Sequence, residues 1–188
     1  MALTQLQKLE LNKRVDKIFC APSNTPIKGH PLEIAFVADI SGNIQEIDNS
    51  IKDAVTALKS HDKLFQNMRS NMVYWGSSIS TKVMPMSFIQ MGKAFEDSED
   101  NIGEIVDKSR NFDQLCGYLK LYHARCRAIL IFIDCTYEEL EKQQYFVLDT
   151  AKAIENLNPF LKYRILLITK DKMEPASALM MKLIRGSI

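Results

Sequence analysis

The sequence has almost no excess of charge of either sign. Its 24 Lys and Arg residues are balanced by 23 Asp and Glu residues, which leaves a formal net charge of +1. A protein with a large nucleic-acid interface needs a basic surface, because phosphate contacts supply much of its affinity. Nucleic-acid binding therefore has no support in the composition.

Long apolar runs are absent as well. No apolar stretch approaches the roughly 20 residues that a membrane-spanning helix requires. Residues 1–17 carry charges where a signal peptide would have its apolar centre. We therefore expect a cytoplasmic protein that does not associate with membranes.

Several sequence motifs are missing. The four cysteines form no CxxC pair, so we expect reduced thiols and not a disulfide framework. The sequence contains no Walker loop, no GxGxxG and no GxSxG, the motifs that mark nucleotide binding and the serine nucleophile of hydrolases. The sequence therefore gives no motif support for a nucleotide-binding protein or a serine hydrolase.

What the sequence does contain is an alternation of continuous apolar runs with helical patterns, which is typical of an α/β protein whose sheet is covered on both faces. Pro85 favours an edge position for one run, in a hairpin with the run before it. We expect a three-layer α/β sandwich with a largely parallel central sheet, one antiparallel edge strand and helices on both faces. The expected strands are 34–38, 72–75, 81–89, 128–133 and 163–169.

The first 30 residues are expected to form an extension. Four apolar residues from Leu11 to Phe19 fall on one face of a candidate helix, and this face is expected to pack on the protein's own domain. Three chain breakers follow in the segment 23–31. We therefore divide the chain into a helical extension at 1–30 and a domain at 31–188.

Three oxygen-bearing side chains follow the first strand at alternate positions: Asp39, Ser41 and Asn43. In an open α/β sheet, the loops at the carboxyl ends of the strands bind ligands. These side chains can therefore converge on a hard cation, which prefers oxygen ligands. The alternative interpretation is a polar turn that caps the helix expected from residue 44.

A second aspartate, Asp134, follows the strongly apolar run 128–133. If the two strands are neighbours, Asp39 and Asp134 meet at one edge of the sheet. An unpaired carboxylate cluster repels itself, so a bound cation would stabilise it.

This arrangement resembles the von Willebrand factor A (vWA) domain family. The metal-ion-dependent adhesion site of that family begins with Asp-x-Ser-x-Ser after the first strand, and this chain has Asn43 in place of the second serine. The family's threonine ligand ahead of a helix corresponds to Ser109, and its last aspartate corresponds to Asp134 in IFIDCT. The resemblance covers residues 32–185. It implies a magnesium site made of Asp39, Ser41, Asn43, Ser109 and Asp134.

The resemblance also implies a function. Members of this family are usually non-catalytic modules that bind a protein partner, and a carboxylate of the partner can complete the shell of the magnesium ion. Small stand-alone bacterial forms act as scaffolds and include proteins associated with tellurite resistance. Within the same family, the alternative is a lapsed site, in which the partner is bound by surface contacts alone.

Two functions of other classes remain open. Asp39, Asp134 and magnesium at one sheet edge would suit a phosphoryl-transfer or phosphatase-type enzyme, with Asp39 as nucleophile or metal ligand. The third hypothesis is a subunit whose helix at 3–20 docks into a larger assembly.

The sequence predicts that Ile131→Asp unfolds the protein, because Ile131 lies in the middle of the run AILIFI. Burying an unpaired carboxylate there costs several kcal/mol, which is comparable with a total domain stability of roughly 5–15 kcal/mol. Solubility and a melting curve measure the effect. A soluble variant with an unchanged melting temperature would contradict the assignment of this run to a central strand.

Overall fold

The computed structural model places about half of the chain in detail, and this part contains the sheet and three helices. All structural statements below concern these residues. The described ranges are 3–20, 33–58, 69–77, 79–87, 110–111, 113–115, 117–118, 126–142 and 165–175.

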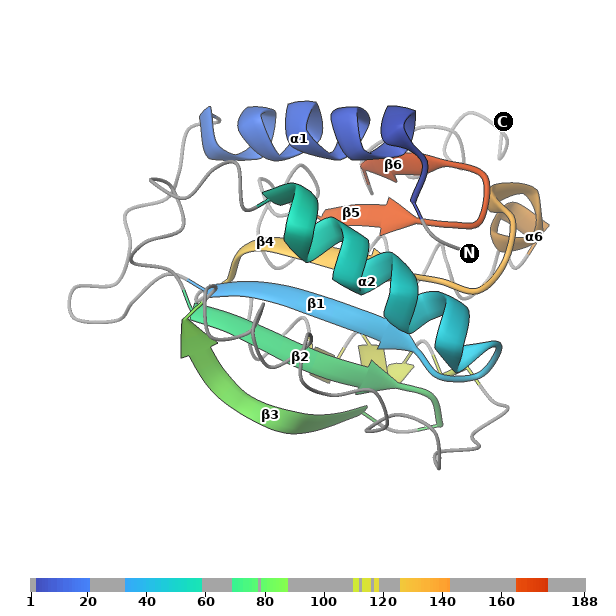
Figure 1. The fold of residues 1–188 in the computed structure, drawn as a ribbon. Coiled ribbons are helices and arrows are strands. Elements are labelled where there is room, and N and C mark those ends of the chain that lie inside the picture. Colours follow the sequence, from blue (N-terminus) through green and yellow to red (C-terminus); the bar gives the residue numbers. More distant parts are fainter. Residues whose placement is uncertain are drawn as a thin grey trace, which may run out of the picture.

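A six-stranded sheet in the order β3-β2-β1-β4-β5-β6 forms the centre of the protein (Figure 1). The four inner strands are parallel, and β3 and β6 pair antiparallel at the two edges. The predicted α/β fold with a largely parallel sheet is confirmed, and β6 adds a second antiparallel edge. The strands are β1 (Glu33–Asp39), β2 (Arg69–Trp75), β3 (Ile79–Ser87), β4 (Cys126–Phe132), β5 (Ile165–Ile168) and β6 (Met173–Pro175).

Each helix begins where a polar side chain accepts a hydrogen bond from a free backbone N–H, as N-caps do. The helices are α1 (Gln5–Cys20), α2 (Ile44–Leu58) and α6 (Tyr137–Lys142). Thr4 caps α1, Asn43 caps α2, and Thr136 with Glu139 forms the predicted capping box of α6. No helix among the described residues is long and apolar enough to cross a membrane.

The sheet carries a hydrophobic layer on each face. On one face, Phe36 and Leu130 pack with α1 and α2, which lie on the same side of the sheet (Figure 1). On the other face, Val37 and Ile131 pack with Tyr118 and with residues of α6. Because side chains alternate along a strand, β1 and β4 supply both layers. This accounts for their continuous apolar sequences.

Helix α1 contributes to the core. Leu11 and Val15 are fully buried, and the helix packs against α2, β4 and β6. The backbone N–H of Leu3 donates to Asp53 Oδ2 of α2 at 2.9 Å, which holds the start of α1 in place. The division of the chain at residue 30 stays a prediction. Wherever the domain begins, α1 covers apolar surface of the sheet.

Two leucines of α1 provide a matched test of this packing. Leu11 is completely buried, whereas Leu6 is 78% exposed. We expect Leu11→Ala to lower the free energy of unfolding by roughly 2–5 kcal/mol, because a buried cavity is left behind. Leu6→Ala should change it by less than about 0.5 kcal/mol. Denaturant unfolding measures both, and equal effects would show that α1 does not use this face for packing.

Candidate functional site

Asp39 and Asp134 lie side by side at the carboxyl edge of the sheet, because their strands β1 and β4 are neighbours. The backbone N–H of Asp134 donates to Asp39 Oδ2 at 3.0 Å. From β1 the sheet continues to β2 on one side and to β4 on the other, which makes this edge a topological switch point. Ligands bind in the crevice at such points in open α/β sheets. The predicted meeting of the two aspartates is therefore found.

The carboxylate of Asp39 is completely buried and has five hydrogen-bond donors around it. Its Oδ1 accepts from the backbone N–H of Ser41 at 2.9 Å and from the Ser41 hydroxyl at 2.5 Å. Its Oδ2 accepts from Arg110 Nε and Nη2, both at 2.9 Å, in addition to the Asp134 N–H. An ionised carboxylate offers about four lone-pair positions, so Asp39 is saturated by protein groups.

Arg110 was not predicted from the sequence. It is held next to Asp39 by its neighbour, Asn111, whose backbone N–H donates to Gly76 O at 2.9 Å. The indole N–H of Trp75 donates to Asn111 O at 2.7 Å. These bonds fix residues 110–111 to the end of β2. Because Arg110 and Asp39 are 71 positions apart, no local pattern announces their contact.

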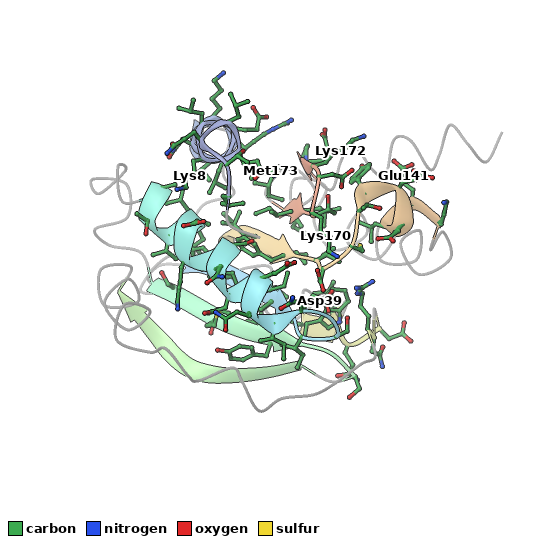
Figure 2. All side chains as sticks on the ribbon, turned by 45° about the vertical axis from the view of Figure 1, so that its right-hand side comes forward. Lys8, Asp39, Glu141, Lys170, Lys172 and Met173 are labelled. Atoms are coloured by element: carbon green, nitrogen blue, oxygen red, sulfur yellow. The ribbon has the colours of Figure 1, made fainter. Side chains whose placement is uncertain are left out.

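Asp134 also has two partners. Its Oδ2 accepts from the backbone N–H of Asn43 at 2.5 Å, and its Oδ1 lies 3.3 Å from Lys170 Nζ. Gly42 allows this approach, because a Cβ atom at that position would collide with the Asp134 carboxylate. The carboxylate therefore lies at the N-terminal end of α2, where the helix dipole favours negative charge. Figure 2 shows Lys170 and Asp39 at the same end of the sheet.

The turn between β5 and β6 holds Lys170 in place. The Lys170 N–H donates to Cys135 O, and the Thr169 N–H donates to Lys172 O, each at 2.9 Å. Asp171 accepts from the first N–H of α6, on Tyr137, at 2.8 Å. Burial acts to raise the pKa of Asp171, but hydrogen bonds from Tyr137 and Thr169 outweigh it and lower that pKa. Lys170 follows the predicted strand 163–169 directly, so its place at this edge was open to inference from the sequence.

In the polar loop after β1, the two predicted metal ligands Ser41 and Asn43 each have a structural role. Ser41 donates to Asp39, and Asn43 Oδ1 accepts from the Glu46 N–H at 3.3 Å as the N-cap of α2. The capping interpretation of this loop therefore applies to Asn43. Ser109 lies outside the described residues. Its place in the predicted ligand set remains a prediction.

This arrangement does not fit a magnesium ion. The electrostatic reason for a cation was an unpaired carboxylate cluster, but Asp39 is paired with Arg110 and Asp134 with Lys170. To coordinate Asp39, an incoming ion would have to displace Arg110, Ser41 or the backbone N–H of Asp134. Among the described residues, no group of three or more His, Cys, Asp or Glu side chains surrounds a common point. The five-residue magnesium site remains a prediction that needs a rearrangement of Arg110.

A small cavity of about 30 Å³ opens beside Asp134 and Lys170. It lies between the starts of α1 and α2 and the ends of β4 and β5, with Gln7, Glu46 and Ile168 in its lining. A cavity of this size has room for one or two water molecules. This cavity by itself is therefore too small to enclose an organic substrate.

No family profile and no curated protein matches this chain. The chemistry of the site must therefore be judged from its own side chains.

Among the side chains that the structure describes, the thiol nearest the site is that of Cys135, which follows Asp134. Burial raises its pKa to about 11, and the positive charge of Arg110 only partly offsets this effect. The thiolate is the nucleophilic form of cysteine, so this side chain is unreactive at neutral pH.

Cys135 gives a pH prediction. Its pKa is raised from 9.0 to about 11 in the folded protein, so it favours folding below pH 9 and this contribution is lost as the pH rises toward 11. At about pH 10 the loss should be roughly 1 kcal/mol. We expect the melting temperature to fall less between neutral pH and pH 10 in Cys135→Ala than in the wild type. Equal falls in the two proteins would contradict the raised pKa.

Proposed function

We propose that this protein is a non-catalytic, cytoplasmic protein-interaction module of the vWA type, which contacts its partner at the carboxyl edge of the sheet. The observation that carries the proposal is the pairing of both crevice carboxylates with basic side chains of the protein itself. Such a site has a fixed shape and balanced charge. It offers surface for recognition and no free reacting group among the described residues.

The same contacts argue against phosphoryl transfer. A nucleophilic aspartate must present a carboxylate oxygen to the phosphorus atom. Asp39 has an exposed fraction of 0%, and both of its oxygens accept hydrogen bonds from protein donors. The phosphatase-type alternative therefore needs Asp39 to leave its present partners.

Lys170 is the most accessible charged group at the crevice. Its side chain is 44% exposed, while that of its partner Asp134 is 8% exposed. The hydrogen bond and the charge of Asp134 raise the pKa of Lys170, so its ammonium group stays charged at all physiological pH values. A carboxylate of a partner protein could therefore approach Lys170, in place of the metal ion that the vWA resemblance implies.

Site-specific cross-linking tests where the partner binds. We expect a photoreactive residue in place of Gln45, an exposed position in the first turn of α2 at this edge, to form a covalent adduct with one partner protein in cells, because this substitution leaves Lys170 and Asp134 unchanged. The matched control is the exposed position 56 near the C-terminal end of α2, away from this edge, which should give no adduct with that protein. Adducts of equal yield from both positions would contradict recognition at this edge.

A phosphatase assay separates the two classes of function. Purified protein with magnesium should not hydrolyse an aryl phosphate above background. Hydrolysis that is lost in Asp39→Asn would overturn the non-catalytic proposal.

Assembly through α1 is the second candidate, and a specific observation favours it. Leu6 and Leu9 are 78% and 59% exposed, three positions apart on the outer face of α1. They are the only large hydrophobic residues that are exposed in the described part of the chain. Because the inner face of α1 belongs to the core, deletion of the helix would damage the fold. The outer face can be changed alone.

We expect the double substitution Leu6→Ala and Leu9→Ala to leave the melting temperature unchanged. If α1 docks into an assembly, the same variant should elute at a smaller size from cell extracts than the wild type. Identical elution of the two proteins would remove this candidate.

A further inference from the structure

We infer that Arg110 is a built-in cation, whose guanidinium group occupies the position beside Asp39 where a divalent ion would bind, so that the crevice is assembled without metal. This inference concerns the internal chemistry of the crevice. It holds whether or not a partner binds there, and protein stability alone tests it.

The carboxylate of Asp39 is buried away from water. Asp39 is 0% exposed, and the Arg110 side chain is only 16% exposed. A carboxylate removed from water is unstable unless it is paired and hydrogen-bonded. Arg110 supplies two N–H donors to Oδ2, both at 2.9 Å. Arginine also keeps its charge at any working pH, so the positive charge beside Asp39 is always present.

Backbone and side-chain hydrogen bonds of the neighbouring residue hold Arg110 in place. Its neighbour Asn111 makes three hydrogen bonds to the end of β2, through its own N–H, its carbonyl oxygen and its side-chain amide. Asn111 Oδ1 also accepts from the N–H groups of Asp113 and Gln114 at the start of the helical residues that follow. The guanidinium group is therefore carried on a fixed segment.

The two ion pairs at the crevice are balanced in charge. Asp39 and Asp134 bring two negative charges, and Arg110 and Lys170 bring two positive charges. A divalent ion added to this set would leave an excess of positive charge in a partly buried place. It would bind only if a basic side chain left, and Arg110 is the more firmly held of the two.

The first experiment needs no Arg110 variant. We expect its melting temperature to be the same in millimolar magnesium and in chelator, since an ion stabilises a protein only when it binds the folded state. A rise with magnesium that disappears in Asp39→Asn would overturn the inference. This arm stays informative even if every Arg110 variant fails to fold.

The second experiment removes the built-in cation. Arg110→Ala leaves a buried, unpaired carboxylate and should lower the melting temperature in chelator by about 10 °C, as expected for a broken buried ion pair in a chain of this length. The space vacated beside Asp39 and Ser41 should then accept a divalent ion. Magnesium, or manganese in a parallel sample, should restore part of the loss in this variant alone.

Two controls make the result specific. Lys142 forms an ion pair with Glu138 on α6, where the two side chains are 72% and 76% exposed, so Lys142→Ala should cost little and should not respond to magnesium. The double variant Arg110→Ala and Asp39→Asn has no carboxylate to neutralise. Its melting temperature should be higher than that of Arg110→Ala in chelator and should not change with magnesium.

Two outcomes would contradict the inference besides a wild-type response. If Arg110→Ala melts like the wild type in chelator, Arg110 does not neutralise Asp39. If it melts lower but gains nothing from either ion, Arg110 is an ordinary ion-pair partner and does not stand in the place of a metal.

Discussion

The burial of the Asp39 carboxylate is the constraint on which the rest of the site depends. β1 ends in this residue at the centre of the sheet, where water does not reach it. A charge in such a place requires a counter-charge and a full set of hydrogen-bond donors. Arg110 meets the first requirement. Ser41 and the backbone of Asp134 help to meet the second.

The same requirement explains the loops around the crevice. Residues 110–111 are fastened to β2, and the β5–β6 turn is fastened to Cys135 and to the start of α6. Each of these loops places one basic residue next to one carboxylate: Arg110 next to Asp39, and Lys170 next to Asp134. The crevice is therefore a closed electrostatic unit built from four parts of the chain that are distant in sequence. A closed unit of this kind suits recognition by shape better than chemistry on a substrate.

Helix α1 has two faces with different roles. One of its faces completes the core through Leu11 and Val15, and its outer face exposes Leu6 and Leu9. A helix that covers its own sheet can still present a second surface to another protein. Substitutions on the outer face test partner binding without changing the core. Removal of the whole helix would change both the core and the outer surface.

The sequence alone determined the α/β class, the central strands β1 and β4 and the capping of α6, and it predicted that Asp39 meets Asp134 if their strands are neighbours. These features follow from local patterns: apolar runs, polar caps and the rule that parallel strands end at one edge. Only the tertiary structure decided what neutralises the two aspartates. Charge pairing between residues 71 positions apart leaves no periodic trace in a sequence, so an empty carboxylate cluster and one filled by Arg110 look the same until the chain is folded.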